Sequence, residues 1–247
     1  MPLTSAGELI KTAWDTFRKT WDTTVRYSVW IVVPGLLQFF EAFIPRNQET
    51  LVGVSAFING LVTILVMLWV TAALYQVALA IEEGVKVTKK TTAAAWSLTP
   101  SLLWVGLLEG AATLGALLLL ILPGIYVGVR VGLAQVALFQ KNMRGRAALA
   151  ESWAVTKARF WATLWRMLSG TVVFGLLSLA VALMAFTLVG IIAGSAKVDA
   201  LFAAESTNPL GSGVSAFIQS LVQAAFTPLF IIYQVKLYRA LDKTRLA

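Results

Sequence analysis

The sequence predicts an all-α, polytopic membrane protein with six transmembrane helices. Hydrophobic residues make up 58% of the chain and charged residues only 13%, whereas charged residues are about a quarter of an average soluble domain. The mean hydropathy is +0.79. Six apolar stretches approach or exceed the roughly 20 residues that a helix needs to cross hydrocarbon, and the basic residues are confined to alternate loops.

The predicted spans are residues 27–43, 56–81, 101–122, 125–139, 164–193 and 214–233. Pro123 and Gly124 separate the third span from the fourth, and this pair predicts a tight helical hairpin. The alternative is one long kinked helix. A helix over 101–139 would be roughly 58 Å long at about 1.5 Å per residue, far beyond the thickness of a bilayer, so we favour the hairpin.

The distribution of lysine and arginine predicts the orientation. All but Arg46, Lys197 and Arg130 of the 20 basic residues lie in the terminal segments or in alternate loops, on what the positive-inside rule makes the cytoplasmic side. We therefore expect both termini in the cytoplasm. The first twenty residues lack an uninterrupted apolar run, so we expect no cleavable signal peptide.

Amphipathic segments with paired tryptophans precede each pair of spans. They predict three interfacial helices and a threefold helix-plus-hairpin repeat inside a single membrane domain, 1–247; an ordinary aromatic belt is the alternative. In the first segment Ser5 begins a capping box, and Ala13 and Phe17 share an apolar face expected to lie flat on the membrane. The predicted repeat units are 5–81, 88–140 and 145–235, with the tryptophan pairs Trp14 and Trp21, Trp96 and Trp104, and Trp153 and Trp161.

Composition excludes several kinds of chemistry. The chain has no cysteine and no histidine, which removes thiolate nucleophiles, serine–histidine pairs and the usual zinc sites. No phosphate-binding glycine loop or paired carboxylate motif occurs. We expect no catalytic residue, no metal and no cofactor. The net charge of +8 is explained by topology, so we expect no nucleic-acid partner.

Three polar residues lie inside the predicted third and fourth spans: Arg130, Glu109 and Gln135. Measured from the Pro123 turn, Glu109 lies about 21 Å away, Arg130 about 10 Å and Gln135 about 18 Å. Gln135 is therefore the predicted neighbour of Glu109. Charges at membrane depth are costly and often functional, but we favour a structural clamp over a transport role.

Small residues at a spacing of four predict close helix packing. The fourth span carries Gly124, Gly128 and Gly132, and the third carries Gly106 and Gly110. We favour packing within the chain over a seam between two copies. Arg130 should point away from the glycine face of its helix.

A basic segment beside two tryptophans predicts contact with anionic lipid headgroups. A topology signal without a ligand is the alternative. The predicted contacts are Lys141, Arg144, Arg146, Lys157, Arg159, Arg166, Trp153 and Trp161.

Two runs carry a family resemblance: LPGIYVGVR at 122–130 and ALAESWAVTKARFW at 148–161. They resemble the membrane domain associated with glycerophosphoryl diester phosphodiesterases and the YciC-like bacterial membrane proteins. Ala158 departs from the glycine usual in that pattern, and Lys141 and Asn142 stand where an acidic residue is common. The resemblance implies the membrane module alone, in a bacterial cytoplasmic membrane, because the phosphodiesterase domain needs histidines.

These observations favour a non-enzymatic integral membrane protein, either a lipid-contacting scaffold or an accessory subunit with a protein partner or a second copy of itself. A transporter or channel for a small molecule or ion, using Arg130, Glu109 and Gln135, is the first alternative. A lipid-modifying membrane enzyme is the second, and it would need clustered carboxylates or hydroxyls that the sequence does not offer.

Overall fold

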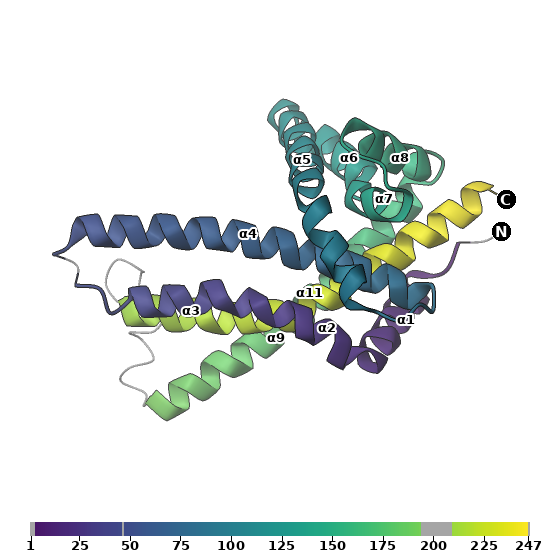
Figure 1. Ribbon diagram of the computed structural model, residues 1–247. Coiled ribbons are helices and arrows are strands. Elements are labelled where there is room, and N and C mark those ends of the chain that lie inside the picture. Colours follow the sequence, from purple (N-terminus) through teal and green to yellow (C-terminus); the bar gives the residue numbers. More distant parts are fainter. Residues whose placement is uncertain (1–2, 46, 194–208, 247) are drawn as a thin grey trace. The chain divides into compact units, whose positions relative to one another are not determined.

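The computed structural model describes residues 3–45, 47–193 and 209–246, and all elements in these ranges are helices. The all-α prediction is confirmed for them. In chain order the helices are α1 (Ala6–Lys19), α2 (Trp21–Ser28), the 3-10 helix η1 (Val29–Ile31), α3 (Val32–Glu41), α4 (Glu49–Glu82), α5 (Lys89–Leu119), α6 (Ile121–Val131), α7 (Ala134–Lys141), α8 (Arg146–Lys157), α9 (Phe160–Ala193) and α11 (Pro209–Leu246) (Figure 1).

Five stretches of helix in the described ranges are long and apolar enough to cross a membrane: Glu49–Glu82, Ala93–Leu119, Ile121–Lys141, Phe160–Ile192 and Leu210–Arg245. They correspond to the second to sixth predicted spans. The first predicted span, 27–43, is divided among α2, η1 and α3. No one helix in that segment reaches spanning length, so a count of six is not confirmed.

The most apolar stretches of α4, α5 and α9 are turned outward, whereas those of Ile121–Lys141 and Leu210–Arg245 are partly buried. None of the most apolar stretch of α4 is buried inside the protein, and only 6% of the corresponding stretch of α9 is. Leu118 and Ile192 are 89% and 85% exposed. Such surface would be unfavourable against water, whereas hydrocarbon is as apolar as these side chains. The bilayer is therefore the solvent that fits the long helices.

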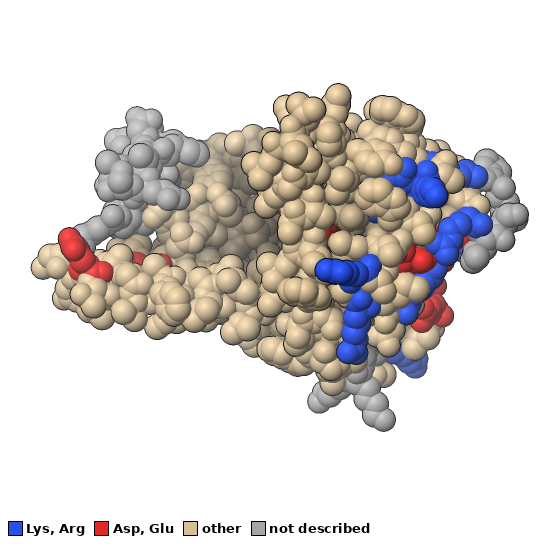
Figure 2. Space-filling view, turned by 90° about the horizontal axis from the view of Figure 1, so that it is seen from above, with Lys and Arg blue, Asp and Glu red and all other residues tan. Residues whose placement is uncertain are grey.

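Contacts within the chain divide it into two compact units. Unit 1 comprises Met1–Thr24, Thr71–Val173 and Pro228–Ala247, and unit 2 comprises Val25–Val70 and Phe174–Thr227. All basic residues except Arg26, Arg46 and Lys197 belong to unit 1. The predicted basic loops are thus collected in one compact body, and lysine and arginine side chains gather on one part of the visible surface (Figure 2).

In unit 1, α5 packs against α6, α7 and α8, which lie side by side (Figure 1). The predicted hairpin exists, but its turn lies at Leu120, where the backbone is extended, and Pro123 falls in the first turn of α6. Proline is tolerated there because the first amides of a helix have no partner within the helix.

Glycines let α6 approach α5 closely. A Cβ added to Gly124 would overlap the side chain of Leu117, and one added to Gly128 would lie 3.4 Å from Thr113 Cγ2. These two residues therefore lie at the contact between α5 and α6. Gly106 and Gly110 make no such contact within the chain, because a Cβ at either would have no atom within 4 Å. Their side of α5 faces open space, which a sequence spacing of four cannot distinguish from a contact.

The N-terminal helix α1 has the predicted cap, since the Glu8 amide donates a hydrogen bond to Ser5 Oγ at 3.2 Å. We expected the apolar face of α1 to lie on the membrane, but that face is covered by protein. Ala13 is 0% and Phe17 5% exposed, so protein covers that face. Trp14 of α1 and Trp21 at the start of α2 remain exposed.

Unit 2 contains α3 and the first part of α11 in close contact. A Cβ on Gly35 of α3 would overlap Ser220 Oγ of α11, and one on Gly213 would lie 3.0 Å from Phe39 Cα. Trp30 and Trp69 also meet edge to face in this unit, with ring centroids 6.1 Å apart. Small residues therefore set the spacing of this pair of helices.

The second predicted interfacial segment does not form a helix of its own. Residues 89–99 continue directly into α5, with Pro100 inside the helix. The first and third segments are separate helices, α1 and α8. The threefold repeat and its boundaries stay a prediction.

Candidate functional site

Helix α8 has one face in the protein and one face outside it. Ala148, Ser152, Val155 and Thr156 recur at helical spacing and are buried. Gly145 precedes the helix with a φ of +54°, a backbone conformation that only glycine adopts without strain. This turn after α7 lays α8 against α5, α6 and α7.

The outer face of α8 and the start of α9 carry exposed cations and tryptophans. Arg144, Arg146 and Lys157 are exposed, as are Trp153 and Trp161, the latter to 77%. These five of the predicted headgroup residues lie on the surface of unit 1. Arg159 is half-buried.

The other two predicted headgroup residues have partners inside the protein. Lys141 Nζ lies 2.7 Å from Glu151 Oε1 and 2.9 Å from Asp242 Oδ1. Arg166 Nε donates to the Thr4 carbonyl at 2.8 Å. Both cations tie together segments that are distant in the chain. The charge of Lys141 is compensated by two carboxylates, whereas the recorded partners of Arg166 are backbone carbonyls.

Lys141 belongs to an ion-pair network that the sequence analysis did not foresee. Glu151 Oε1 also accepts hydrogen bonds from Arg245 Nη1 at 3.1 Å and from the Tyr238 hydroxyl at 3.4 Å. Burial by itself would raise the pKa of Glu151, but hydrogen bonds and charge from Lys141 and Arg245 hold it below its usual value of 4.5. The carboxylate is therefore held ionised and joins α7, α8 and α11.

Arg130 is enclosed by aromatic rings. Its side chain is 5% exposed, and Cζ lies 4.9 Å from the ring centroid of Tyr126 and 5.6 Å from those of Trp153 and Phe160. Nη2 donates to the Tyr126 hydroxyl at 2.9 Å. As expected, the side chain points away from the glycine face that packs on α5.

No carboxylate in the described ranges forms an ion pair with Arg130, and its Nε and Nη1 have no hydrogen-bond partner. Burying an unpaired charge costs several kcal/mol, whereas a desolvated cation–π contact returns roughly 2 kcal/mol. Three rings together offset much of that cost. The arrangement joins α6 to α8. The predicted clamp would lock the hairpin of α5 and α6 instead, and a structural role for Arg130 stays a prediction.

The fourth predicted span is interrupted between α6 and α7. An unbroken helix would bond the Leu133 amide to residue 129 and the Arg130 carbonyl to residue 134. Instead, Leu133 N donates to Ser152 Oγ at 3.1 Å, and that hydroxyl donates to the Arg130 carbonyl at 2.7 Å. Ser152 is 0% exposed. One side chain of α8 thus satisfies two of the backbone groups that the break frees.

Glu109 and Gln135 meet as the helical rise predicts. Gln135 Nε2 donates to Glu109 Oε2 at 3.3 Å, and Arg130 is not part of this pair. The contact joins α5 to α7. Arg130 and the Glu109–Gln135 pair therefore form two separate contacts.

Groups of three or more acidic residues that could hold a metal ion are absent from residues 3–45, 47–193 and 209–246. No family model matches this chain, and no curated protein or solved structure is significantly similar to it. The family resemblance stays a prediction.

Proposed function

We propose that this chain is a non-enzymatic, multi-pass membrane protein that binds anionic lipids along α8 and serves as a scaffold or accessory subunit. The observation that carries the proposal is the outer face of α8, where Arg146 and Lys157 stand exposed beside Trp153. Tryptophan prefers the headgroup level, and each lysine or arginine near an anionic surface contributes about 1 kcal/mol of attraction.

The burial of the opposite face of α8 supports the same function. Because Ser152 and Thr156 are fully buried, α8 cannot rotate to hide its cations or expose its other side. The buried Arg130 guanidinium also lies against the Trp153 ring, 5.6 Å from its centroid. A basic surface held rigid in this way binds lipid without first losing conformational entropy.

The proposal includes a topology. We place both termini and α8 on the cytoplasmic side of a bacterial inner membrane, with segment 27–43 as a sixth crossing in spite of its division. The positive-inside bias of the basic residues supports this placement. A protein partner or a second copy fits a scaffold, and the outward-facing Gly106 and Gly110 leave a surface for one.

Native mass spectrometry of the protein released from nanodiscs tests the lipid contact. In a bilayer of phosphatidylglycerol and phosphatidylcholine, wild type should retain phosphatidylglycerol preferentially. The triple variant R144Q/R146Q/K157Q should lose most of that preference, because three attractions are removed. The matched control R144K/R146K/K157R keeps every charge and should retain it. Equal retention by wild type and the glutamine variant would refute the lipid contact.

One observation favours a transporter as a second candidate. Interrupted helices at membrane depth often surround substrate sites, and α6 and α7 form such a pair. Against this, the backbone groups freed by the break bond Ser152 rather than facing a cavity. Ion flux in proteoliposomes that disappears in Glu109→Gln would support the transporter, and flux no greater than in empty liposomes would reject it.

A further inference from the structure

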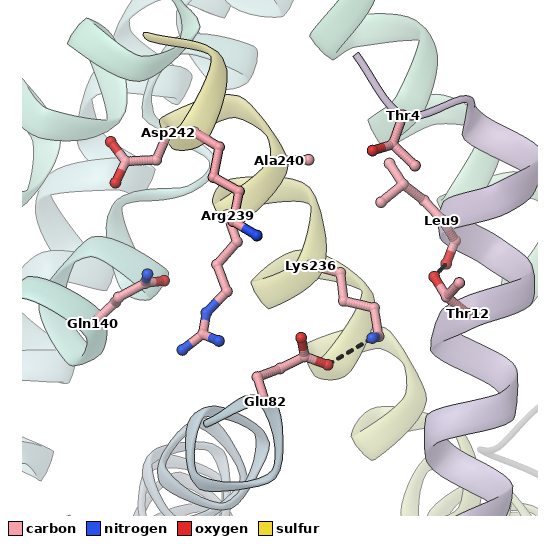
Figure 3. Close-up of a pocket in the computed structure, with 10 residues that line it drawn as sticks. Thr4, Leu9, Thr12, Glu82, Gln140, Lys236, Arg239, Ala240 and Asp242 are labelled. Atoms are coloured by element: carbon pink, nitrogen blue, oxygen red, sulfur yellow. Dashed lines mark hydrogen bonds and ion pairs between the residues drawn. The ribbon is translucent and has the colours of Figure 1, made fainter. Parts of the chain in front are cut away.

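An open pocket of about 430 Å³ lies within unit 1, walled by α1, the end of α4, α7 and the last turns of α11 (Figure 3). Its lining mixes polar and apolar surface. Ligand pockets in proteins run from about 300 to 1,000 Å³, and a water molecule takes only about 30 Å³. The cavity is therefore far larger than a packing defect. It lies at the end of the chain's last candidate span, near the basic C-terminal residues.

Basic side chains dominate the wall formed by α11. Lys236, Arg239 and Lys243 stand at positions i, i+3 and i+7 of that helix, on one face, and all three line the cavity. Glu82 and Asp242 are the acidic residues of the lining. The charge of Asp242 is already bound, because its Oδ1 lies 2.9 Å from Lys141 Nζ.

Two of the three cations keep binding capacity. Lys236 is committed to Glu82, with Nζ 2.6 Å from Oε1. Arg239 Nη2 contacts Glu83 at 3.0 Å, and the Glu83 side chain is exposed, so solvent weakens this pair. Lys243 is exposed and forms no ion pair with a described residue. Cationic donors therefore exceed the acidic acceptors inside the cavity.

Gln140 and Arg239 face one another in the lining. Figure 3 shows the Arg239 side chain extending from α11 into the space between Gln140 and Glu82. Gln140 Oε1 has no hydrogen-bond partner, but burial closes that atom off from the pocket. A ligand suited to this pocket therefore needs anionic oxygens for Arg239 and Lys243.

We propose that this cavity binds a phosphate group, carried either by a small soluble anion or by a phosphomonoester lipid headgroup. Phosphate oxygens are strong acceptors for guanidinium and ammonium groups. The inference does not depend on lipid contact at α8, because the cavity and that surface share no residue.

The test measures phosphate binding by isothermal titration calorimetry of the protein in maltoside micelles, at constant ionic strength. Wild type should bind inorganic phosphate, and Arg239→Gln and Lys243→Gln should each weaken binding about tenfold or more, the loss expected for one charge-assisted hydrogen bond. Ala240→Phe keeps every charge but fills the cavity, so it should abolish binding. Lys19→Gln, exposed in the last turn of α1 and outside the lining, is the control and should bind like wild type.

A second arm separates the two sources of phosphate. Wild type in nanodiscs with and without phosphatidic acid, in phosphate-free buffer, is analysed for retained lipid. Retention lost in Lys243→Gln, without binding of inorganic phosphate, identifies a lipid headgroup as the ligand. Binding of neither probe overturns the proposal, as does binding that Arg239→Gln, Lys243→Gln and Ala240→Phe all leave unchanged. Size-exclusion profiles of each variant establish that it is folded.

Discussion

Ser152 is the residue on which the interrupted span depends. The change Ser152→Ala removes the partner of the Leu133 amide and of the Arg130 carbonyl, at a site with no access to water. Leaving buried polar groups unpaired costs about 1 to 3 kcal/mol. We expect the free energy of unfolding to fall by about that amount, measured by dodecyl sulfate titration followed by tryptophan fluorescence.

The matched control is Ser169→Ala. Its hydroxyl bonds the Trp165 carbonyl of its own helix, a carbonyl that can also serve the helical backbone, so its removal should change stability little. Equal losses in Ser152→Ala and Ser169→Ala would contradict the account of the break.

Glu151 gives stability a defined dependence on pH. Its pKa in the folded protein lies below the usual 4.5, so its ion pairs contribute fully above pH 4.5 and are lost as the pH falls through the folded value. The Glu151→Gln variant has no carboxylate at this position, so its stability carries no pH dependence from that group. We expect the stability difference between wild type and Glu151→Gln to be constant near neutrality and to shrink under acid, followed by thermal melts in detergent. If the stability difference grew as the pH fell, the pKa of Glu151 would be raised in the folded protein rather than lowered.

At the scale of elements, α5 and α6 are joined by glycine contacts on one side only. Gly124→Ala places a methyl group against Leu117, and overpacking of this kind costs typically 1 to 3 kcal/mol, so we expect a loss of roughly that size. Gly110→Ala meets nothing within 4 Å and should be neutral or stabilising by about 0.5 to 1 kcal/mol, because alanine favours helix.

Unfolding titrations of the two glycine variants measure the contrast directly. Both residues lie in helices predicted to cross the membrane, so the two variants are compared in the same kind of environment. If Gly110→Ala were the more damaging change, the side of α5 that it occupies would be in contact with something outside the chain, such as a second copy.

At the scale of the whole molecule, topology is open to a clean chemical test because the chain has no cysteine. We expect Ala147→Cys to resist a membrane-impermeant maleimide added to intact spheroplasts, and Asn47→Cys to react with it. The cysteine-free parent is the control for background. Labelling of both positions, or of neither until the cells are lysed, would place the basic loops and the first loop on the same side and overturn the proposed arrangement.

Sequence reasoning went furthest where a repeating pattern decides the outcome. Apolar length predicted the long helices, the Pro123 region predicted a hairpin, and the rise per residue paired Glu109 with Gln135. Spacing did not reveal that Gly106 and Gly110 lack a neighbour within the chain, because it does not show which side of a helix is covered. A local pattern likewise could not show that Asp242 lies beside Lys141.

The sequence by itself determined the class of this protein and the solvent that fits it, because hydrophobicity and helical period are properties of consecutive residues. Only the tertiary structure decided which polar groups are satisfied internally and which remain available. Arg130 lies among three aromatic rings. Ser152 bonds backbone groups at the break between α6 and α7. Arg239 and Lys243 line one pocket. Those outcomes depend on contacts between residues distant in the chain, which composition and spacing do not specify.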